Sequence, residues 1–134
     1  MSTISIDLGL KLTTEQRKIE GEKMEYASGL IQLKPGTEGK VEEWRNTISS
    51  RFDEAAATLQ DENVYIESWF KIEIKGERYL LWYLRANSIK RVFEISMQLK
   101  HPIDKFHYDL MAEITAKNGN IQAEPLVDIP RELP

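Results

Sequence analysis

Apolar and polar residues alternate along the chain with two different periods, and the changes of period mark the expected elements. The stretch "YASGLIQLK" (26–34) has a period of two, which predicts a strand with Ile31 and Leu33 on one face. Between residues 37 and 60 the apolar positions recur every three or four residues, which predicts one amphipathic helix capped by Thr37. Its apolar stripe comprises Val41, Trp44, Ile48, Phe52, Ala55 and Leu59.

The next two segments predict a β-hairpin. "NVYIESWFKIEI" (63–74) and "RYLLWYLRA" (78–86) alternate again, and Lys75-Gly76 fits the tight turn because glycine tolerates a positive φ. On the face toward the helices we expect Ile31, Leu33, Val64, Ile66, Phe70, Ile72, Leu80, Trp82 and Leu84. On the opposite face, called the open face below, we expect Leu30, Gln32, Tyr65, Glu67, Trp69, Tyr79, Leu81, Tyr83 and Arg85.

Two further helical segments follow the hairpin. Ser88 is suited to cap a helical region over residues 89–100. Pro102 interrupts this region and favours the first position of another helix, because the residue before a proline avoids helical geometry. The apolar stripe of that helix contains His107, and Gly119 fits just past its end.

The last segment, "NIQAEPLVDI" (120–129), predicts a weaker strand at a sheet edge, because Pro125 has no N–H for a neighbouring strand. The resulting order is β-α-β-β-α-β, which predicts an α+β fold of ferredoxin-like type with a four-stranded antiparallel sheet. We expect this domain to span residues 25–134. Residues 1–24 are polar and predict an N-terminal arm that is either mobile or laid across a neighbouring surface.

The open face predicts how the protein assembles. Its aromatic and leucine side chains would expose roughly 500 Å² or more of apolar surface, near the upper limit for a monomer. A second copy of the same sheet, related by a two-fold axis, is the simplest cover. We therefore expect a homodimer through the open face, with a heterologous partner as the alternative.

Composition and charge exclude several classes of protein. The chain has 134 residues, 30% of them charged, and a net charge of −4, so it lacks the basic surface of a nucleic-acid-binding protein. It has no cysteine, which excludes disulfides and thiolate sites. No apolar run is long enough to cross a membrane, and the N-terminus lacks signal-peptide features. We expect a cytoplasmic protein.

Three motifs give the chain a family resemblance. The runs "LIQLKPGTEGKVEEW", "DEAAATLQDENVYIESWF" and "HPIDKFHYDL" resemble an uncharacterised bacterial family placed with the dimeric α+β barrel superfamily. The resemblance covers residues 26–128. It implies the ferredoxin-like fold and a sheet-to-sheet dimer, but it brings no activity or cofactor, because the superfamily includes monooxygenases, haem-handling enzymes and binding modules.

His107 and Glu67 are the candidate catalytic residues. A histidine within an apolar stripe can act as a general base facing a cavity, or it can be a core residue satisfied by a hydrogen bond. Glu67 lies between Tyr65 and Trp69, where partial burial would raise its pKa, but it can also pair with Lys71 or Arg85. His101 and His107 do not have the spacing of metal ligands on one helix face, so no metal site is expected.

The candidate ligand-binding residues are Trp69, Tyr83, Arg85, Glu62 and Glu54. The first three would form an aromatic pocket with an anion-binding end, while packing is the other explanation for the same aromatic residues. Glu54 and Glu62 match the family motif, although a pair such as Arg51 with Glu54 on a solvated helix face also explains them.

Three functional hypotheses follow. The first is a homodimer that binds a small aromatic or apolar molecule between sheet and helices. The second is a cofactor-independent monooxygenase or isomerase that uses His107 and Glu67. The third is an assembly module without a ligand, in which aromatic side chains fill the barrel.

Overall fold

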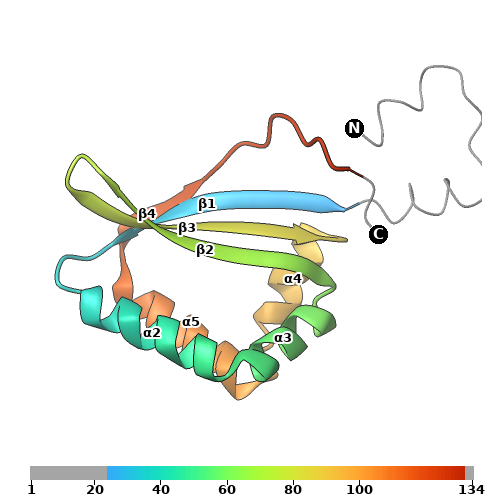
Figure 1. The fold of residues 1–134 in the computed structure, drawn as a ribbon, viewed down its shortest axis with the longest axis horizontal. Coiled ribbons are helices and arrows are strands. Elements are labelled where there is room, and N and C mark those ends of the chain that lie inside the picture. Colours follow the sequence, from blue (N-terminus) through green and yellow to red (C-terminus); the bar gives the residue numbers. More distant parts are fainter. Residues whose placement is uncertain (1–23, 132–134) are drawn as a thin grey trace, which may run out of the picture.

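A four-stranded antiparallel sheet with helices against one face forms the body of the molecule (Figure 1). The computed structural model describes residues 24–131, so the predicted N-terminal arm lies outside the described residues except for Met24. The elements are β1 (Glu25–Leu33), α2 (Glu38–Ser50), α3 (Phe52–Asp61), β2 (Val64–Ile74), β3 (Glu77–Ala86), α4 (Ile89–Ser96), α5 (Pro102–Ile114) and β4 (Thr115–Gln122). The α+β class is confirmed. No described helix is long and apolar enough to cross a membrane.

The strands lie in the order β2-β3-β1-β4, and every neighbouring pair is antiparallel. Strand β1 matches its prediction, and Ile31 and Leu33 are buried on the face toward the helices. The hairpin turn at Lys75-Gly76 also matches: both residues have positive φ, and Ile74 pairs with Glu77. Strands β2 and β4 are the sheet edges.

The predicted single helix over residues 37–60 is wrong, because the chain breaks at Arg51 into α2 and α3. The backbone of Arg51 has φ −111° and ψ 38°, outside the helical range, although its N–H still donates to the Thr47 carbonyl. The Ser50 hydroxyl also donates to the Thr47 carbonyl (3.1 Å), so a side chain competes for this acceptor at the last turn of α2. The break turns Phe52 out of the apolar stripe and leaves it 68% exposed.

The helix ends follow the predictions in part. Ser88 caps α4 by accepting from the Arg91 N–H, and Pro102 begins α5. Thr37 does not cap α2, because its hydroxyl donates to the Lys34 carbonyl instead. Gly119 does not end α5, since that helix ends at Ile114 and Gly119 lies within β4.

The last strand lies earlier than predicted. Strand β4 covers Thr115–Gln122 rather than residues 120–129, so Pro125 follows the strand and does not limit it. The strand starts directly after α5, and its register against β1 shifts between Ile31 and Leu33. The main-chain N–H of Ala123 still donates to Ser28, after which the chain leaves the sheet.

The predicted faces of β2 are wrong for most of the strand. Cross-strand partners share a face, and Glu67, Trp69 and Lys71 are paired with Leu84, Trp82 and Leu80 of β3, which face the helices. The open face receives instead Ile66, Ser68, Phe70, Ile72 and Ile74. An irregularity between Val64 and Ile66 shifts the register, so Val64 alone keeps its predicted side.

The core consists of two apolar clusters beneath the sheet. The first contains Ile31, Leu33, Val41, Trp44, Leu80, Leu110 and Ile114, from β1, β3, α2 and α5. The second contains Val64, Leu84, Ala86 and Val92, from β2, β3 and α4. Trp82 packs against both, and Trp69 packs against the first. Along β2, Glu67 lies between Val64 of the second cluster and Trp69, which packs against the first.

Candidate functional site

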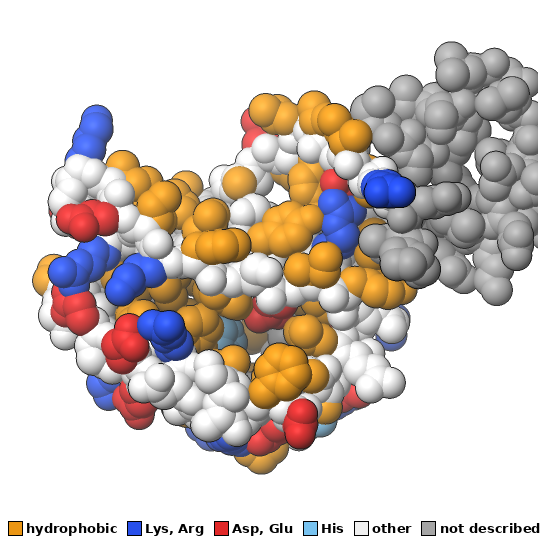
Figure 2. All heavy atoms as spheres, in the orientation of Figure 1, with side chains coloured by type: hydrophobic (Ala, Val, Ile, Leu, Met, Phe, Trp, Pro, Cys, Tyr) orange, Lys and Arg blue, Asp and Glu red, His pale blue; other side chains and the backbone are white. Residues whose placement is uncertain are grey.

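A groove runs between α2 and the edge strand β2. Its volume is about 300 Å³, within the range of small-molecule sites. The apolar wall is formed by Val41, Trp44, Trp69 and Leu80, with Glu42, Arg45, Phe70 and Lys71 completing the lining. Figure 2 shows this side of the molecule hollowed between sheet and helices, with acidic and histidine side chains visible inside.

Two tryptophans connect the groove to a group of polar side chains. The rings of Trp44 and Trp69 meet edge to face, with centroids 5.2 Å apart. Each indole N–H has a polar partner: Trp44 Nε1 donates to His107 Nδ1 (2.9 Å), and Trp69 Nε1 donates to Glu67 Oε2 (2.9 Å). The two indoles therefore hold the two predicted catalytic side chains in fixed orientations.

His107 is held neutral beside these rings. It projects from α5, and its ring centroid lies 5.5 Å from that of Trp69 and 6.0 Å from that of Trp44. Burial lowers the pKa of His107, because the charged imidazolium would lose solvation, and the nearby Asp104 opposes this only in part. At neutral pH the imidazole is therefore uncharged.

Glu67 has the opposite shift. Glu67 is an exposed residue of β2 whose Oε2 accepts from Trp69 Nε1. Desolvation raises the pKa of Glu67, the hydrogen bond from Trp69 partly lowers it, and the charge of Asp104 raises it further. The net effect is a pKa above the ordinary value of a glutamate.

Glu62 is a second acid with a raised pKa. It follows α3 and is only 8% exposed. Burial is the main cause that raises its pKa to about 7, and the charges of Glu67, Asp104 and Asp61 add to the effect. His101 opposes it from the start of α5. Three acidic groups from α3, β2 and α5 therefore influence one another in this region.

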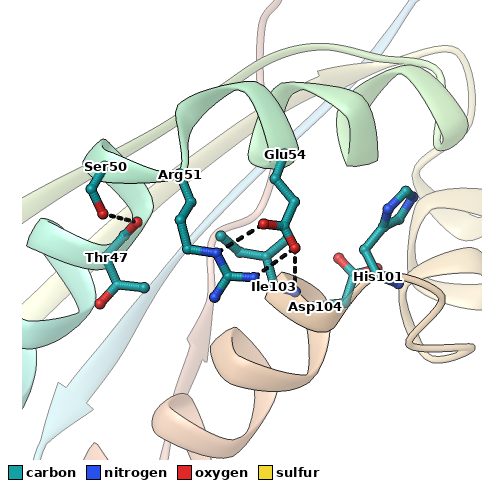
Figure 3. A network of polar contacts seen from close by, with 7 residues as sticks. All are labelled: Thr47, Ser50, Arg51, Glu54, His101, Ile103 and Asp104. Carbon is teal, nitrogen blue, oxygen red and sulfur yellow. Dashed lines mark hydrogen bonds and ion pairs between the residues drawn. The ribbon is translucent and has the colours of Figure 1, made fainter.

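Glu54 belongs to a separate structural network (Figure 3). Its carboxylate accepts two bonds from Arg51, at 2.8 and 2.6 Å, and one from the main-chain N–H of Ile103. Next to it, Asp104 accepts from the main-chain N–H of His101. Glu54 thus ties the break between α2 and α3 to the start of α5, and we assign it a structural role.

Tyr83 and Arg85 lie on the open face, away from the groove. They belong to β3 positions that alternate with Leu80, Trp82 and Leu84, and they pair with Ser28 and Tyr26 of β1. The Arg85 guanidinium donates to Tyr83 and forms an ion pair with Asp128 (2.5 Å). The predicted pocket of Trp69, Tyr83 and Arg85 is therefore wrong, because the sheet separates Trp69 from the other two.

The structure places His107 and Glu67 beside the tryptophans of the groove, and Glu62 within electrostatic range of Glu67; we call the groove with these neighbouring side chains the cleft. Two further residues belong to it that the sequence did not single out. The sequence identified Trp44 only as part of an apolar stripe. Because a buried indole N–H needs a hydrogen-bond acceptor, its burial could have predicted a polar partner such as His107. Asp104 gave no signal, because its position depends on how α5 packs. Among residues 24–131 no group of three or more potential metal-binding side chains is close enough to hold an ion.

The described arrangement provides an apolar slot, a neutral imidazole and two acids with raised pKa values. Such a set can bind a small molecule with both apolar and polar parts, and it can donate or accept a proton.

The chain was compared with curated proteins and with models of protein families. Curated proteins give no match to the chain. A family model described as a family of unknown function (DUF6176) matches residues 24–132, which is most of the chain and includes every residue of the cleft. The chain belongs to this family of unknown function.

Proposed function

We propose that this protein is a ferredoxin-like, dimeric α+β barrel protein that binds a small aromatic or apolar molecule between its sheet and helices. The observation that supports this most directly is the groove of about 300 Å³ whose tryptophan wall also orients Glu67 and His107. The two indole N–H groups fix the orientation of both titratable side chains beside this wall.

The lining matches such a ligand. Val41, Leu80 and the two indoles offer flat apolar surface, and stacking or edge contacts with aromatic rings contribute about 0.5–1.5 kcal/mol beyond area burial. Arg45 and Lys71 add charge at one part of the lining, while Glu67 and His107 adjoin the tryptophans. The combination favours a molecule with an apolar body and a polar group.

The groove is tested by filling it. Val41→Phe places extra volume in the lining and should weaken binding of a small aromatic probe such as indole at least about tenfold, which corresponds to ~1.4 kcal/mol. Val127→Phe is the matched control, because Val127 is 64% exposed on the C-terminal segment. Calorimetric titration measures both, with circular dichroism to verify folding. Equal affinities in the two variants would contradict binding in the groove.

The open face supports the dimer. Large apolar side chains remain exposed there on β2 and β4, namely Ile66 (43%), Phe70 (54%), Ile72 (37%), Ile74 (40%) and Ile121 (46%). The C-terminal segment, held to this face by the Arg85–Asp128 ion pair, adds exposed Leu126, Val127 and Ile129. Together they expose on the order of 900 Å², close to the ~800 Å² that one partner buries in a standard interface. The molar mass of the protein in solution tests whether it forms this dimer.

A second candidate function is proton-transfer catalysis, favoured by the raised pKa of Glu67 and of Glu62 beside a neutral histidine. A general acid or base works best when its pKa lies near the operating pH. Incorporation of solvent deuterium into bound probe molecules, followed by NMR, measures this activity. We expect Glu67→Gln to abolish it and Glu73→Gln, near the hairpin turn, to retain it. An unchanged rate in Glu67→Gln would exclude Glu67 as the base.

A further inference from the structure

We propose that the molecule bound in the cleft carries a neutral carbonyl oxygen that accepts a hydrogen bond from Nε2–H of His107, with Trp44 as the positioning residue. This inference rests on the proposed function and names the chemical class of its ligand. It follows from which atoms of His107 and Glu67 are already bonded.

The first step concerns the tautomer of His107. An indole N–H can only donate, so His107 Nδ1, 2.9 Å from Trp44 Nε1, must be an unprotonated acceptor. Because the imidazole is neutral in its buried setting, its one proton is on Nε2. The protein thus fixes one of the two neutral tautomers by a single contact between α2 and α5.

The second step concerns the free end of the ring. Among the described residues Nε2 of His107 has no hydrogen-bond partner, and no buried side-chain nitrogen or oxygen there is left without one. The Nε2–H group is therefore not fully buried, and its ring adjoins Trp44 and Trp69, the two tryptophans that line the groove. A ligand group that satisfies this donor must offer an acceptor, which excludes an ammonium group at this position.

The third step concerns charge. Carboxylates, phosphates and carbonyls all offer acceptor oxygens, but Asp104 lies near His107, and Glu67 and Glu62 lie near Asp104. Arg45 and Lys71 also line the groove, but Asp104 is the charge that acts on His107. A full negative charge placed at His107 would therefore be repelled and would lose solvation. A ketone or aldehyde oxygen pays no such penalty. With the flat walls of Trp44 and Trp69, the best match is an aromatic ketone or aldehyde.

Glu67 provides a second polar group for the proposed ligand. Its Oε2 accepts from Trp69, and its other oxygen has no hydrogen-bond partner among residues 24–131. With a raised pKa, this carboxyl group can be protonated and donate, or ionised and accept, next to the ligand. The ligand is therefore expected to lie against the indoles with its carbonyl directed to His107.

The experiment uses four probes of similar shape on the full chain: acetophenone, ethylbenzene, 1-phenylethylamine and benzoate. Binding is measured by NMR titration, and the nitrogen resonances of the His107 imidazole report its tautomer. We expect acetophenone to bind about tenfold tighter than each of the others, since it alone pairs a neutral acceptor with this donor. We also expect the Nε2–H tautomer and a shift of Nε2 on binding.

Trp44→Phe provides the readout for positioning. It keeps an aromatic ring but removes the N–H donor, so the Nε2–H tautomer should lose its dominance and the preference for acetophenone should fall to about threefold or less. Should the variant not fold, the tautomer in the unaltered chain decides the same point, because a proton on Nδ1 would overturn the inference.

The outcomes separate the two proposals. Equal binding of acetophenone and ethylbenzene would overturn the carbonyl assignment and leave the groove as a binding site. Preference for benzoate or for the amine would overturn it in favour of an ionic ligand. If no probe binds, the proposed binding function and this inference fall together.

Discussion

The indole N–H groups of Trp44 and Trp69 connect packing to chemistry at the scale of single residues. Both rings belong to the apolar environment of the first core cluster, yet each donates to a side chain that titrates. Rigid donors of this kind fix the acceptors that they hold, which is what a preorganised site requires. Their N–H groups explain why a histidine and a glutamate are tolerated between two apolar clusters.

Glu62 yields a prediction about stability against pH. Its pKa is raised to about 7 by burial, so the folded state disfavours the charged form. Below the pKa that Glu62 has in the unfolded chain, the group is protonated in both states and does not lower the free energy of unfolding. As the pH rises through the pKa of the folded state, the free energy of unfolding falls. Glu62→Gln should leave the free energy of unfolding unchanged near pH ~4 and raise it by about 1–2 kcal/mol near pH ~8.5.

Urea unfolding at the two pH values measures this effect. The expected change in the free energy of unfolding is set below a full conversion of the pKa shift, because neighbouring acidic charges, and not burial alone, contribute to that shift. Glu42→Gln, on the exposed surface of α2, is the control and should change little at either pH. A variant less stable than the unaltered chain near pH ~8.5 would mean that the charged form of Glu62 is favoured in the fold.

At the scale of elements, strand β1 and the break at Arg51 shape the cleft. The break redirects the chain after α2, and the ion pair of Arg51 with Glu54 and the bond to Ile103 fix α3 against the start of α5 (Figure 3). Strand β1 is central in the sheet and approaches its neighbours closely at Gly29. There a Cβ atom would lie 2.8 Å from the Ile121 carbonyl oxygen and 2.9 Å from the Trp82 ring.

Gly29→Ala should therefore lower the free energy of unfolding by about 2 kcal/mol or more, because backbone and a large ring must move. Gly39→Ala is the matched control, since nothing lies within 4 Å of its added Cβ and it stands in α2. That change should stabilise the protein by about 0.5 kcal/mol, because alanine favours helices. Thermal and urea unfolding measure both. Equal effects of the two substitutions would contradict the close approach at Gly29.

The elements also show what the sequence could and could not predict. Strand β1, the hairpin turn and the start of α5 follow from local signals: alternation, Lys75-Gly76 and Pro102. The faces of β2 were predictable from the same turn, because a two-residue turn that pairs Ile74 with Glu77 places Ile72 opposite Tyr79. The predicted faces of β2 were chosen instead by polarity, with Glu67 placed away from the helices, and this choice disregarded the geometry of the turn.

Other features had no local signal. The irregularity after Val64 and the break at Arg51 depend on tertiary packing, and both change which side chains share a face. His107 and Glu67 were identified from their types and apolar neighbours. The hydrogen bond between Trp44 and His107 and the influence of the Asp104 charge on Glu62 and Glu67 join residues far apart in sequence. Only the packing of α5 against α2 and β2 brings them together.

At the scale of the whole molecule, the sheet has on one side the apolar groove with His107 and Glu67 beside it, and on the other side the apolar open face. The corrected register makes the open face more apolar than the sequence analysis expected, because Ile66, Phe70 and Ile72 replace Glu67 and Trp69 there. Within residues 24–131 the helices lie against one face of the sheet (Figure 1). The proposed dimer would bury the other face and leave both clefts at the outside of the assembly.

Phe70→Glu tests this arrangement. A charge in place of this exposed apolar side chain of edge strand β2 should convert a dimer to a monomer, measured by light scattering over a range of concentrations. Phe52→Glu is the control, because Phe52 is 68% exposed on α3 and lies outside the proposed interface. An unaltered chain that is monomeric at every concentration, or a dimer that persists with Phe70→Glu, would contradict the sheet-to-sheet interface.

The central claim is that the groove beside Trp44 and Trp69 is a ligand site. The chain contains three tryptophans, so a nitrogen–proton NMR spectrum has one indole signal for each. On titration with acetophenone we predict concentration-dependent, saturating shifts of the Trp44 and Trp69 signals, larger than any shift of Trp82, which is not part of the groove lining. Unchanged Trp44 and Trp69 signals at high probe concentration, or a shift confined to Trp82, would contradict the claim.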